Sequence, residues 1–221
     1  MASQGFLAVV VPLLAAASCV CAPAQNLLRL VREGTPEAVQ AAIRSGADVN
    51  AGDADGWTPL MAAAGYNSRL DVIRELLNAG ADVNAWDGMS MTALNWAAMR
   101  SANPRVIDLL LKAGADIESR DIGGDTPLMF AARYNPDPGV LSALVKAGAD
   151  LEARDHTEET ALLLSARYNS PDIVTVLLGA GADPDAADSL GMTAYDYGRE
   201  NNKLRGTPTL ERLRVVSRKK P

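Results

Sequence analysis

The clearest pattern along the chain is an apolar stripe at positions i, i+1, i+4 and i+5, which occurs four times at nearly constant intervals. Side chains with this spacing lie on one face of an α-helix, so the pattern predicts four amphipathic helices. A glycine follows each stripe where a helix commonly ends in a left-handed residue, a conformation that glycine adopts without a β-carbon clash. The stripes are Val72, Ile73, Leu76 and Leu77; Val106, Ile107, Leu110 and Leu111; Val140, Leu141, Leu144 and Val145; and Ile173, Val174, Leu177 and Leu178, and the glycines are Gly80, Gly114, Gly148 and Gly181.

Two short motifs recur in phase with these helices. A Gly-Ala-Asp motif begins at residues 46, 80, 114, 148 and 181, and a threonine motif, Thr-Pro-Leu or a variant of it, begins at residues 58, 92, 126, 160 and 193. The intervals are therefore 34, 34, 34 and 33 residues for both motifs. Two signals with the same period predict a repeat array, in which each unit packs on its neighbours.

Each interior unit is predicted to contain a turn-rich hairpin, a short helix opened by the threonine motif, a loop and the amphipathic helix. The first unit lacks the threonine motif, but Thr35 fits the cap and Pro36 the first position of its second helix. The last unit turns polar, as expected of a terminal unit with one side in solvent. The predicted organisation is a leader over residues 1–24, an N-terminal capping unit over 25–50, four interior units over 51–185, a C-terminal capping unit over 186–216 and a basic tail over 217–221.

These motifs together resemble those of the ankyrin repeat family, over residues 26–216. The family's pattern is present in the second unit as Asp53, Gly56, Thr58, Pro59, Leu60, Ala63, Ala64, Val72, Ile73, Leu76, Leu77 and residues 80–84. The resemblance implies an all-α solenoid of six helix pairs, including both caps, with β-hairpin or turn loops between repeats. The loop between the paired helices carries one residue more than the family pattern, and in this it resembles the loop of a subset of bacterial ankyrin proteins, many of them exported.

One departure from the family pattern concerns the histidine that commonly follows the threonine motif. Its place is taken by Met61, Asn95, Met129 and Leu163, so we expect the usual hydrogen bonds between repeats to be missing or replaced.

The leader is typical of a secretory signal peptide, because residues 5–17 are almost wholly apolar and uncharged and small residues follow them. Cleavage after Ala24 would leave Gln25 as the mature N-terminus, in the periplasm or outside the cell. Both cysteines, Cys19 and Cys21, lie in this leader. An uncleaved anchor, or a lipoprotein acylated at Cys19, is the alternative.

Charge divides the chain into an acidic body and a basic end. Residues 25–198 contain 13 Lys and Arg against 25 Asp and Glu, a net charge of −12, and residues 199–221 contain 8 against 2, a net charge of +6. An acidic body argues against nucleic acid as a partner, because nucleic-acid binding needs a basic surface. The basic end leaves open contact with an anionic lipid surface.

Candidate catalytic and metal-binding groups are sparse, so we predict a protein that is not an enzyme and has no cofactor or metal. The one histidine, His156, lies in a predicted hairpin, where a solvated side chain is the simpler interpretation. A zinc site would need three or four converging His, Cys or carboxylate ligands, and His156 is the one nitrogen ligand in the sequence. The acidic runs at residues 53–56 and 183–188 coincide with the turns of the repeat and lack the glutamate that closes a calcium loop.

The family resemblance implies a monomeric module that binds a protein partner through its concave face, made of the hairpin tips and the exposed side of each first helix. Residue types that dominate interfaces, above all Trp, Tyr and Arg, occur at these positions. The recurring Tyr-Asn pairs at residues 66, 134 and 168 are either structural or part of the binding surface. A small-molecule binder and an envelope-tethered scaffold are the alternative functions. The candidate partner-binding residues are Asp55, Trp57, Tyr66, Met89, Met91, Trp96, Arg100, Asp125, Phe130, Arg133, Tyr134, Arg167 and Tyr168.

Overall fold

The computed structural model describes residues 23–67 and 69–216, which form twelve helices and no extended strand. The helices are α1 (Pro23–Glu33), α2 (Pro36–Arg44), α3 (Pro59–Tyr66), α4 (Leu70–Asn78), α5 (Ala93–Arg100), α6 (Pro104–Lys112), α7 (Pro127–Tyr134), α8 (Pro138–Lys146), α9 (Ala161–Tyr168), α10 (Pro171–Ala180), α11 (Ala194–Glu200) and α12 (Pro208–Val216). They pair in chain order into six repeats, which we number one to six.

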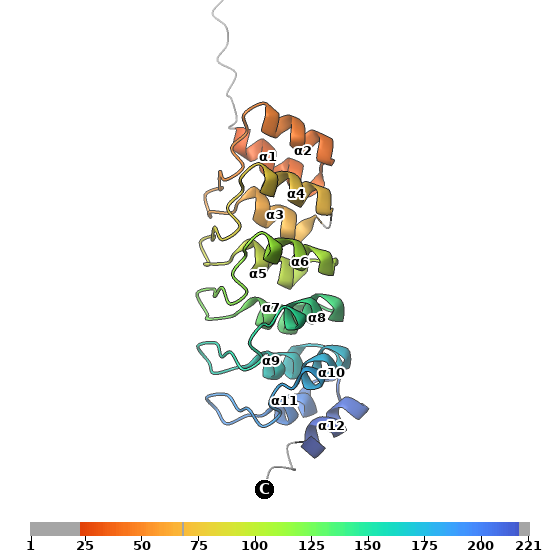
Figure 1. Cartoon of the computed structure of the whole chain (residues 1–221). Helices are drawn as coiled ribbons and strands as arrows, with labels where there is room; N and C mark the ends of the chain where they lie inside the picture. The colour runs from red at the N-terminus through yellow and green to blue at the C-terminus, as the bar shows by residue number, and fades with distance from the viewer. Residues whose placement is uncertain (1–22, 68, 217–221) are drawn as a thin grey trace, which may run out of the picture.

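The repeats stack in a single column with the loops between them projecting to one side (Figure 1). The first helix of each repeat packs on the first helices of the repeats before and after it, and the second helices form a parallel layer. The loops are hairpin-like turns, with isolated antiparallel bridges between Trp86 and Thr92 and between Ala187 and Thr193. The all-α solenoid predicted from the repeat period is confirmed.

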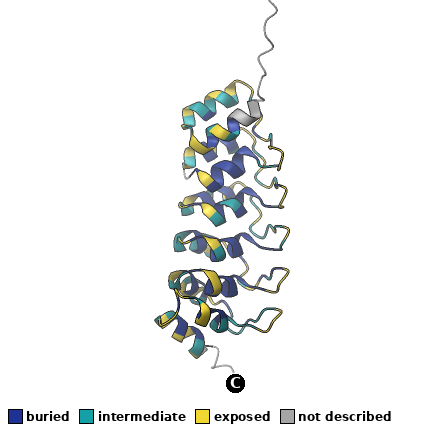
Figure 2. Ribbon diagram, turned by 180° about the vertical axis from the view of Figure 1, so that it is seen from behind, coloured by how far each residue is buried: buried dark blue, intermediate teal, exposed yellow. Residues whose placement is uncertain are grey.

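The first helices are short and small-sided, which allows close packing in the column. In α3 every residue from Pro59 to Gly65 is buried, and Ala63 and Ala64 are at most 1% exposed. Figure 2 shows that buried residues are concentrated where the two layers meet. Alanine at these positions lets adjacent helix backbones approach, so a larger residue would force neighbouring repeats apart.

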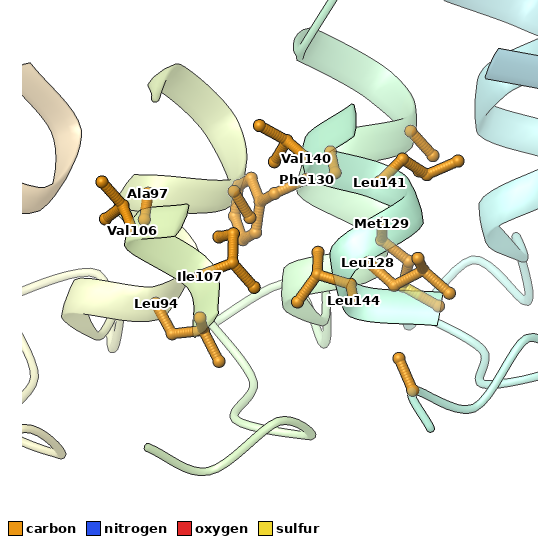
Figure 3. Close-up of a cluster of buried hydrophobic side chains, with 14 of the residues drawn as sticks. Leu94, Ala97, Val106, Ile107, Leu128, Met129, Phe130, Val140, Leu141 and Leu144 are labelled. Carbon is orange, nitrogen blue, oxygen red and sulfur yellow. The ribbon is translucent and has the colours of Figure 1, made fainter. Parts of the chain in front are cut away.

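The second helices add a stripe of large aliphatic side chains to the core. Val72, Ile73 and Leu76 are fully buried, whereas Arg74 on the opposite face is exposed. The same stripe in later repeats interdigitates with leucines of the first helices, as the cluster from α5 to α8 shows in Figure 3. Burying one such aliphatic side chain stabilises the fold by roughly 2 kcal/mol.

The threonine motifs cap five of the first helices, α3, α5, α7, α9 and α11. In each of them the threonine hydroxyl oxygen accepts a hydrogen bond from the backbone N–H three residues later at 3.4 Å, and Thr35 makes the same bond at 3.3 Å at the start of α2. Thr35 therefore caps α2 as predicted. Each cap satisfies a helix N–H that would otherwise lack a partner.

The Gly-Ala-Asp motifs join one repeat to the next. Gly80 has a φ of +87°, which confirms that it takes the predicted left-handed conformation. The first glycine of every other Gly-Ala-Asp motif also has a positive φ. The carboxamide of Asn50 donates to the Gly80 carbonyl at 3.0 Å and accepts from the Asp82 N–H at 2.8 Å. Asn84 makes the same pair of bonds one repeat further on. Glutamate replaces asparagine at 118 and 152. Its carboxylate still accepts a hydrogen bond from the backbone N–H of Asp150 or Asp183 in the next motif.

The missing family histidine is replaced differently in different repeats. Asn95 donates to the Ser119 carbonyl at 3.4 Å and accepts from the Ser119 hydroxyl at 3.0 Å, which links two repeats. The sulfur of Met61 instead accepts the Thr58 N–H within its own repeat. At Asn95 a different side chain therefore supplies hydrogen bonds between repeats.

A second set of asparagines joins the repeats at the opposite end of the first helices. Asn169 is 4% exposed, and its carboxamide donates to the carbonyls of Ala132 and Asn135 in the preceding repeat, at 3.0 and 2.9 Å. Asn135 and Asn201 donate to equivalent pairs of carbonyls, and Asn67 donates to Val31. The asparagines of the Tyr-Asn pairs are therefore structural.

Helix α1 begins at Pro23, two residues before the predicted mature N-terminus at Gln25. Residues 1–22 of the predicted leader, with Cys19 and Cys21, and the predicted basic tail over 217–221 lie outside the described residues. None of the helices that the structure describes is both long and apolar enough to span a membrane.

Replacing Asn169 by alanine removes two buried hydrogen bonds and leaves two carbonyls of the preceding repeat without a donor. We expect Asn169→Ala to lower the free energy of unfolding by about 3 kcal/mol. Urea unfolding followed by circular dichroism measures this loss. The exposed Asn202 provides a control, and Asn202→Ala should leave stability within about 0.5 kcal/mol of the wild type. Equal effects of the two substitutions would contradict the role of Asn169.

Candidate functional site

An aromatic groove with a volume of about 430 Å³ lies between repeats two and three on the loop-facing side. Its floor and walls come from two hairpin loops and from α3 and α5. The lining residues are Asp53, Asp55, Trp57, Tyr66, Asp87, Gly88, Met89 and Trp96. A smaller depression of about 270 Å³ continues from it towards α1 and shares Asp53 and Trp57.

Three aromatic rings form the wall of this groove. The ring of Trp57 meets Tyr66 edge-on, with centroids 5.5 Å apart and an angle of 89°, and meets Trp96 at 5.3 Å and 61°. Edge contacts of this kind add to the stabilisation from buried area. Tyr66 is 41% exposed and Met89 51%, so the groove presents apolar surface to solvent.

Asp87 holds Trp96 in place. One carboxylate oxygen accepts the indole N–H of Trp96 at 2.8 Å, and the other accepts the backbone N–H groups of Met89 and Met91. The hairpin and the ring are therefore positioned by one buried side chain. The indole N–H of Trp57 is also buried, but it has no acceptor among the described residues. A buried donor without a partner costs about 1–3 kcal/mol, which makes Trp57 a poor choice for a purely structural position.

Two arginines lie over the ring of Tyr66. The guanidinium carbons of Arg32 and Arg100 each lie 4.9 Å from its ring centroid, and Arg32 also lies 5.5 Å from that of Trp57. These cation–π contacts fix the ring orientation. Arg32 was not among the sequence candidates, although it follows Val31 as Arg133 follows Ala132 in the fourth repeat. Aligning the N-terminal cap with the later repeats would have found it.

Repeats four and five carry an ionic cluster in place of the aromatic groove. Arg133 lies 3.1 Å from Asp125 and 3.6 Å from both Asp155 and Glu159, and Arg167 lies 3.0 Å from Glu159. Both arginines also contact the ring of Tyr168, at 5.8 and 5.1 Å. The three carboxylates are at most 8% exposed. Their charges are therefore neutralised largely within the protein.

Burial raises the pKa of Asp125 from 3.8 to about 6, against the opposing effect of the Arg133 guanidinium, with further increases from the neighbouring carboxylates of Asp121, Asp155 and Glu159. A second perturbed group lies in repeat six. A hydrogen bond from the Tyr197 hydroxyl to Asp188 raises the pKa of Tyr197 to about 12.

A family model described as ankyrin repeats in three copies matches the chain twice, over residues 27–121 and 101–188. The chain belongs to the ankyrin repeat family. No curated protein matches it. Ankyrin repeats generally mediate protein–protein interaction.

Two residues predicted to bind a partner belong instead to the core of the ankyrin stack. Met91 is 2% and Phe130 5% exposed, so neither can contribute a contact surface, and these two predictions are corrected. Phe130 stacks beneath Tyr134 with centroids 6.2 Å apart. Asp125 is 8% exposed and is engaged by Arg133, so it too is removed from the binding surface. Sequence position identified the loop-facing side of each repeat, but neighbouring repeats decided the depth of each side chain.

The remaining candidates are at least partly accessible and separate into two groups. Asp55, Trp57, Tyr66, Met89 and Trp96 come together in the aromatic groove, with Arg100 beside them. Arg133, Tyr134, Arg167 and Tyr168 lie along the ionic cluster in the fourth and fifth repeats. The accessible candidates of repeats two and three are therefore centred on Trp57, Tyr66 and Trp96.

The hairpin carboxylates shape the turns. One oxygen of Asp53 accepts the N–H groups of Asp55 and Trp57, and the same arrangement recurs at Asp87 and Asp121. His156 is exposed, and its backbone N–H donates to the Gly123 carbonyl of the adjacent hairpin. Within the part of the chain that is described, no group of three or more His, Cys, Asp or Glu side chains is arranged to hold a metal ion.

The raised pKa of Asp125 predicts an unusual pH dependence of stability. The folded state binds this proton more tightly than the unfolded chain, so the contribution to stability is full below about pH 4 and is lost as the pH rises through about 6. Asp125→Asn stays neutral, so its stability relative to the wild type should rise by on the order of 2 kcal/mol between about pH 4 and 7.

Urea unfolding of both proteins at each pH measures this difference. The control is Asp71→Asn, because Asp71 has a highly exposed side chain on α4, and its difference from the wild type should stay nearly constant. A constant difference for Asp125→Asn would show that its carboxyl titrates normally.

Proposed function

We propose that this ankyrin repeat protein is a non-catalytic interaction module that binds a protein partner mainly through the aromatic groove. The observation that carries the proposal is the grouping of Trp57, Tyr66 and Trp96 around an accessible depression. Binding energy at interfaces concentrates in Trp, Tyr and Arg side chains, because they combine large apolar area with a polar group. The exposed methionine beside them, Met89, can adapt to a partner's shape.

The rest of the loop-facing surface supports this choice of groove. In repeats four and five the arginines are already paired with buried carboxylates, so a partner would have to compete with those pairs. In repeats two and three the aromatic edges remain available. The partner is therefore expected to make its central contacts at the N-terminal half of the stack.

We further propose that the protein is exported. The apolar, uncharged run over residues 5–17 and the small residues before Gln25 support cleavage after Ala24. Cleavage there would leave most of α1, including Leu27 and Val31, whose side chains are fully buried. The repeat stack would thus keep its N-terminal cap.

Removing two rings of the groove should abolish partner capture. With Trp57→Ala and Tyr66→Ala combined, we expect at least about a tenfold loss of the proteins captured by the wild type, because truncating two central aromatic residues costs several kcal/mol. Quantitative mass spectrometry of captured material measures this. The matched control combines Arg105→Ala and Lys112→Ala on exposed positions of α6 and should capture normally. Unchanged capture by the groove variant, with a preserved circular dichroism spectrum, would move the binding site elsewhere.

Expression of the full chain in a bacterial host tests export. We expect the protein in the periplasmic fraction with Gln25 at its N-terminus, as determined by N-terminal sequencing and intact mass. Replacing both Ala22 and Ala24 by arginine should block cleavage. An acylated form that disappears with Cys19→Ser would establish a lipoprotein, and an intact leader in the cytoplasm would contradict export.

A further inference from the structure

The loop-facing surface is divided chemically at the boundary between repeats three and four. The residue before each threonine motif is Asp125 in repeat four and Glu159 in repeat five, and each pairs with an arginine of the following helix, Arg133 or Arg167. The same position holds Trp57 in repeat two and Met91 in repeat three. The N-terminal half therefore has no arginine–carboxylate pair at this position, and the aromatic groove occupies the space.

The groove's own charges are negative. Its ionisable lining residues, apart from Tyr66, are Asp53, Asp55 and Asp87. Asp53 and Asp87 each use one oxygen to hold a hairpin turn. Asp55 is exposed, and its carboxylate makes no hydrogen bond or ion pair with any residue of 23–67 or 69–216. A carboxylate in water at the rim of an apolar groove is available to a cation.

Two arginines lie beside the groove, against three carboxylates in its lining. Arg32 and Arg100 contact the ring of Tyr66, and they also lie 5.5 Å from the ring centroid of Trp57 and 5.9 Å from that of Trp96, respectively, but neither is a lining residue of the groove. Residues 25–198 as a whole carry a net charge of −12, which attracts basic partners and repels acidic ones during approach. The charge of the groove lining and the net charge of the body therefore both favour a positively charged ligand.

We propose that the aromatic groove recognises an extended basic peptide segment of the partner, with one Lys or Arg side chain lying along the wall that Trp57 and Trp96 form. This specificity rests on the proposed function of the groove. The methylene stem packs on the rings and Met89, and the charged end reaches the Asp55 carboxylate. The groove's volume of about 430 Å³ accommodates one long side chain. Aromatic walls with a carboxylate at the rim match an aliphatic stem that ends in a cation.

Selection from a phage-displayed library of random heptapeptides tests this specificity without knowledge of the natural partner. Peptides that bind the purified repeat region at low salt should be enriched in Lys or Arg at one position. Synthetic forms of the enriched peptides should bind about tenfold more weakly to Asp55→Asn than to the wild type, and binding should weaken as ionic strength rises. Replacing the basic residue of the peptide by norleucine should cause a similar loss.

Tyr66→Ala and Tyr168→Ala form a matched pair of protein variants. The two tyrosines occupy the same position in repeats two and five and are 41% and 44% exposed. Tyr66→Ala should lose the selected peptides, whereas Tyr168→Ala should retain them. Both variants remove a ring that is exposed to a similar extent, and circular dichroism checks that the fold is unchanged.

The possible outcomes distinguish a failure of the basic-segment assignment from a failure of the groove as a binding site. Peptides that depend on Tyr66 but are acidic or purely apolar would overturn the basic-segment assignment and leave the groove as a binding site. Peptides that bind all variants equally would overturn both. Absence of enrichment would overturn the assignment. Self-association in sedimentation equilibrium that ends when Arg218, Lys219 and Lys220 are deleted would replace the partner by the basic tail of a second copy.

Discussion

Contact between neighbouring repeats is the interaction on which the whole structure depends. No repeat encloses a core alone: Leu76 and Ile107 are fully buried because the helices of successive repeats cover them. Polar bonds secure both edges of these interfaces. Asn84 joins successive Gly-Ala-Asp motifs on one side, and Asn169 ties one helix end to the preceding repeat on the other. Stability is therefore transmitted from neighbour to neighbour along the stack.

This constraint also determines where the surface can vary. The first helices are enclosed on nearly all sides, so their side chains remain accessible mainly near the C-terminal end and in the preceding hairpin. Residues there can change without opening the core. Repeats four and five use this freedom for arginine–carboxylate pairs, and repeats two and three use it for aromatic rings. One scaffold thus carries an internally neutralised surface beside an apolar, acidic one.

Buried ionic groups and aromatic edges have different consequences at such a surface. Arg133 is surrounded by three carboxylates, and burial leaves Asp125 with a pKa of about 6. A partner that displaced these contacts would leave charges unpaired in a poorly hydrated site. Trp57, Tyr66 and Trp96 form no such closed network, and covering them removes apolar surface from water. The physical cost of binding is therefore lower at the aromatic groove.

Local information in the sequence determined the architecture, because the features that specify it act over short distances. Thr58 caps the helix that it precedes, Gly80 adopts the conformation that its missing β-carbon permits, and the apolar spacing follows from the helical period. The sequence also placed Trp57, Tyr66 and Trp96 on the loop-facing side. Only the tertiary structure decided that Met91 and Phe130 are buried, that Arg32 covers Tyr66, and that Asp125 is enclosed by residues of the next repeat. Depth and charge pairing depend on what the adjacent repeat covers, and periodicity within one repeat carries no information about that.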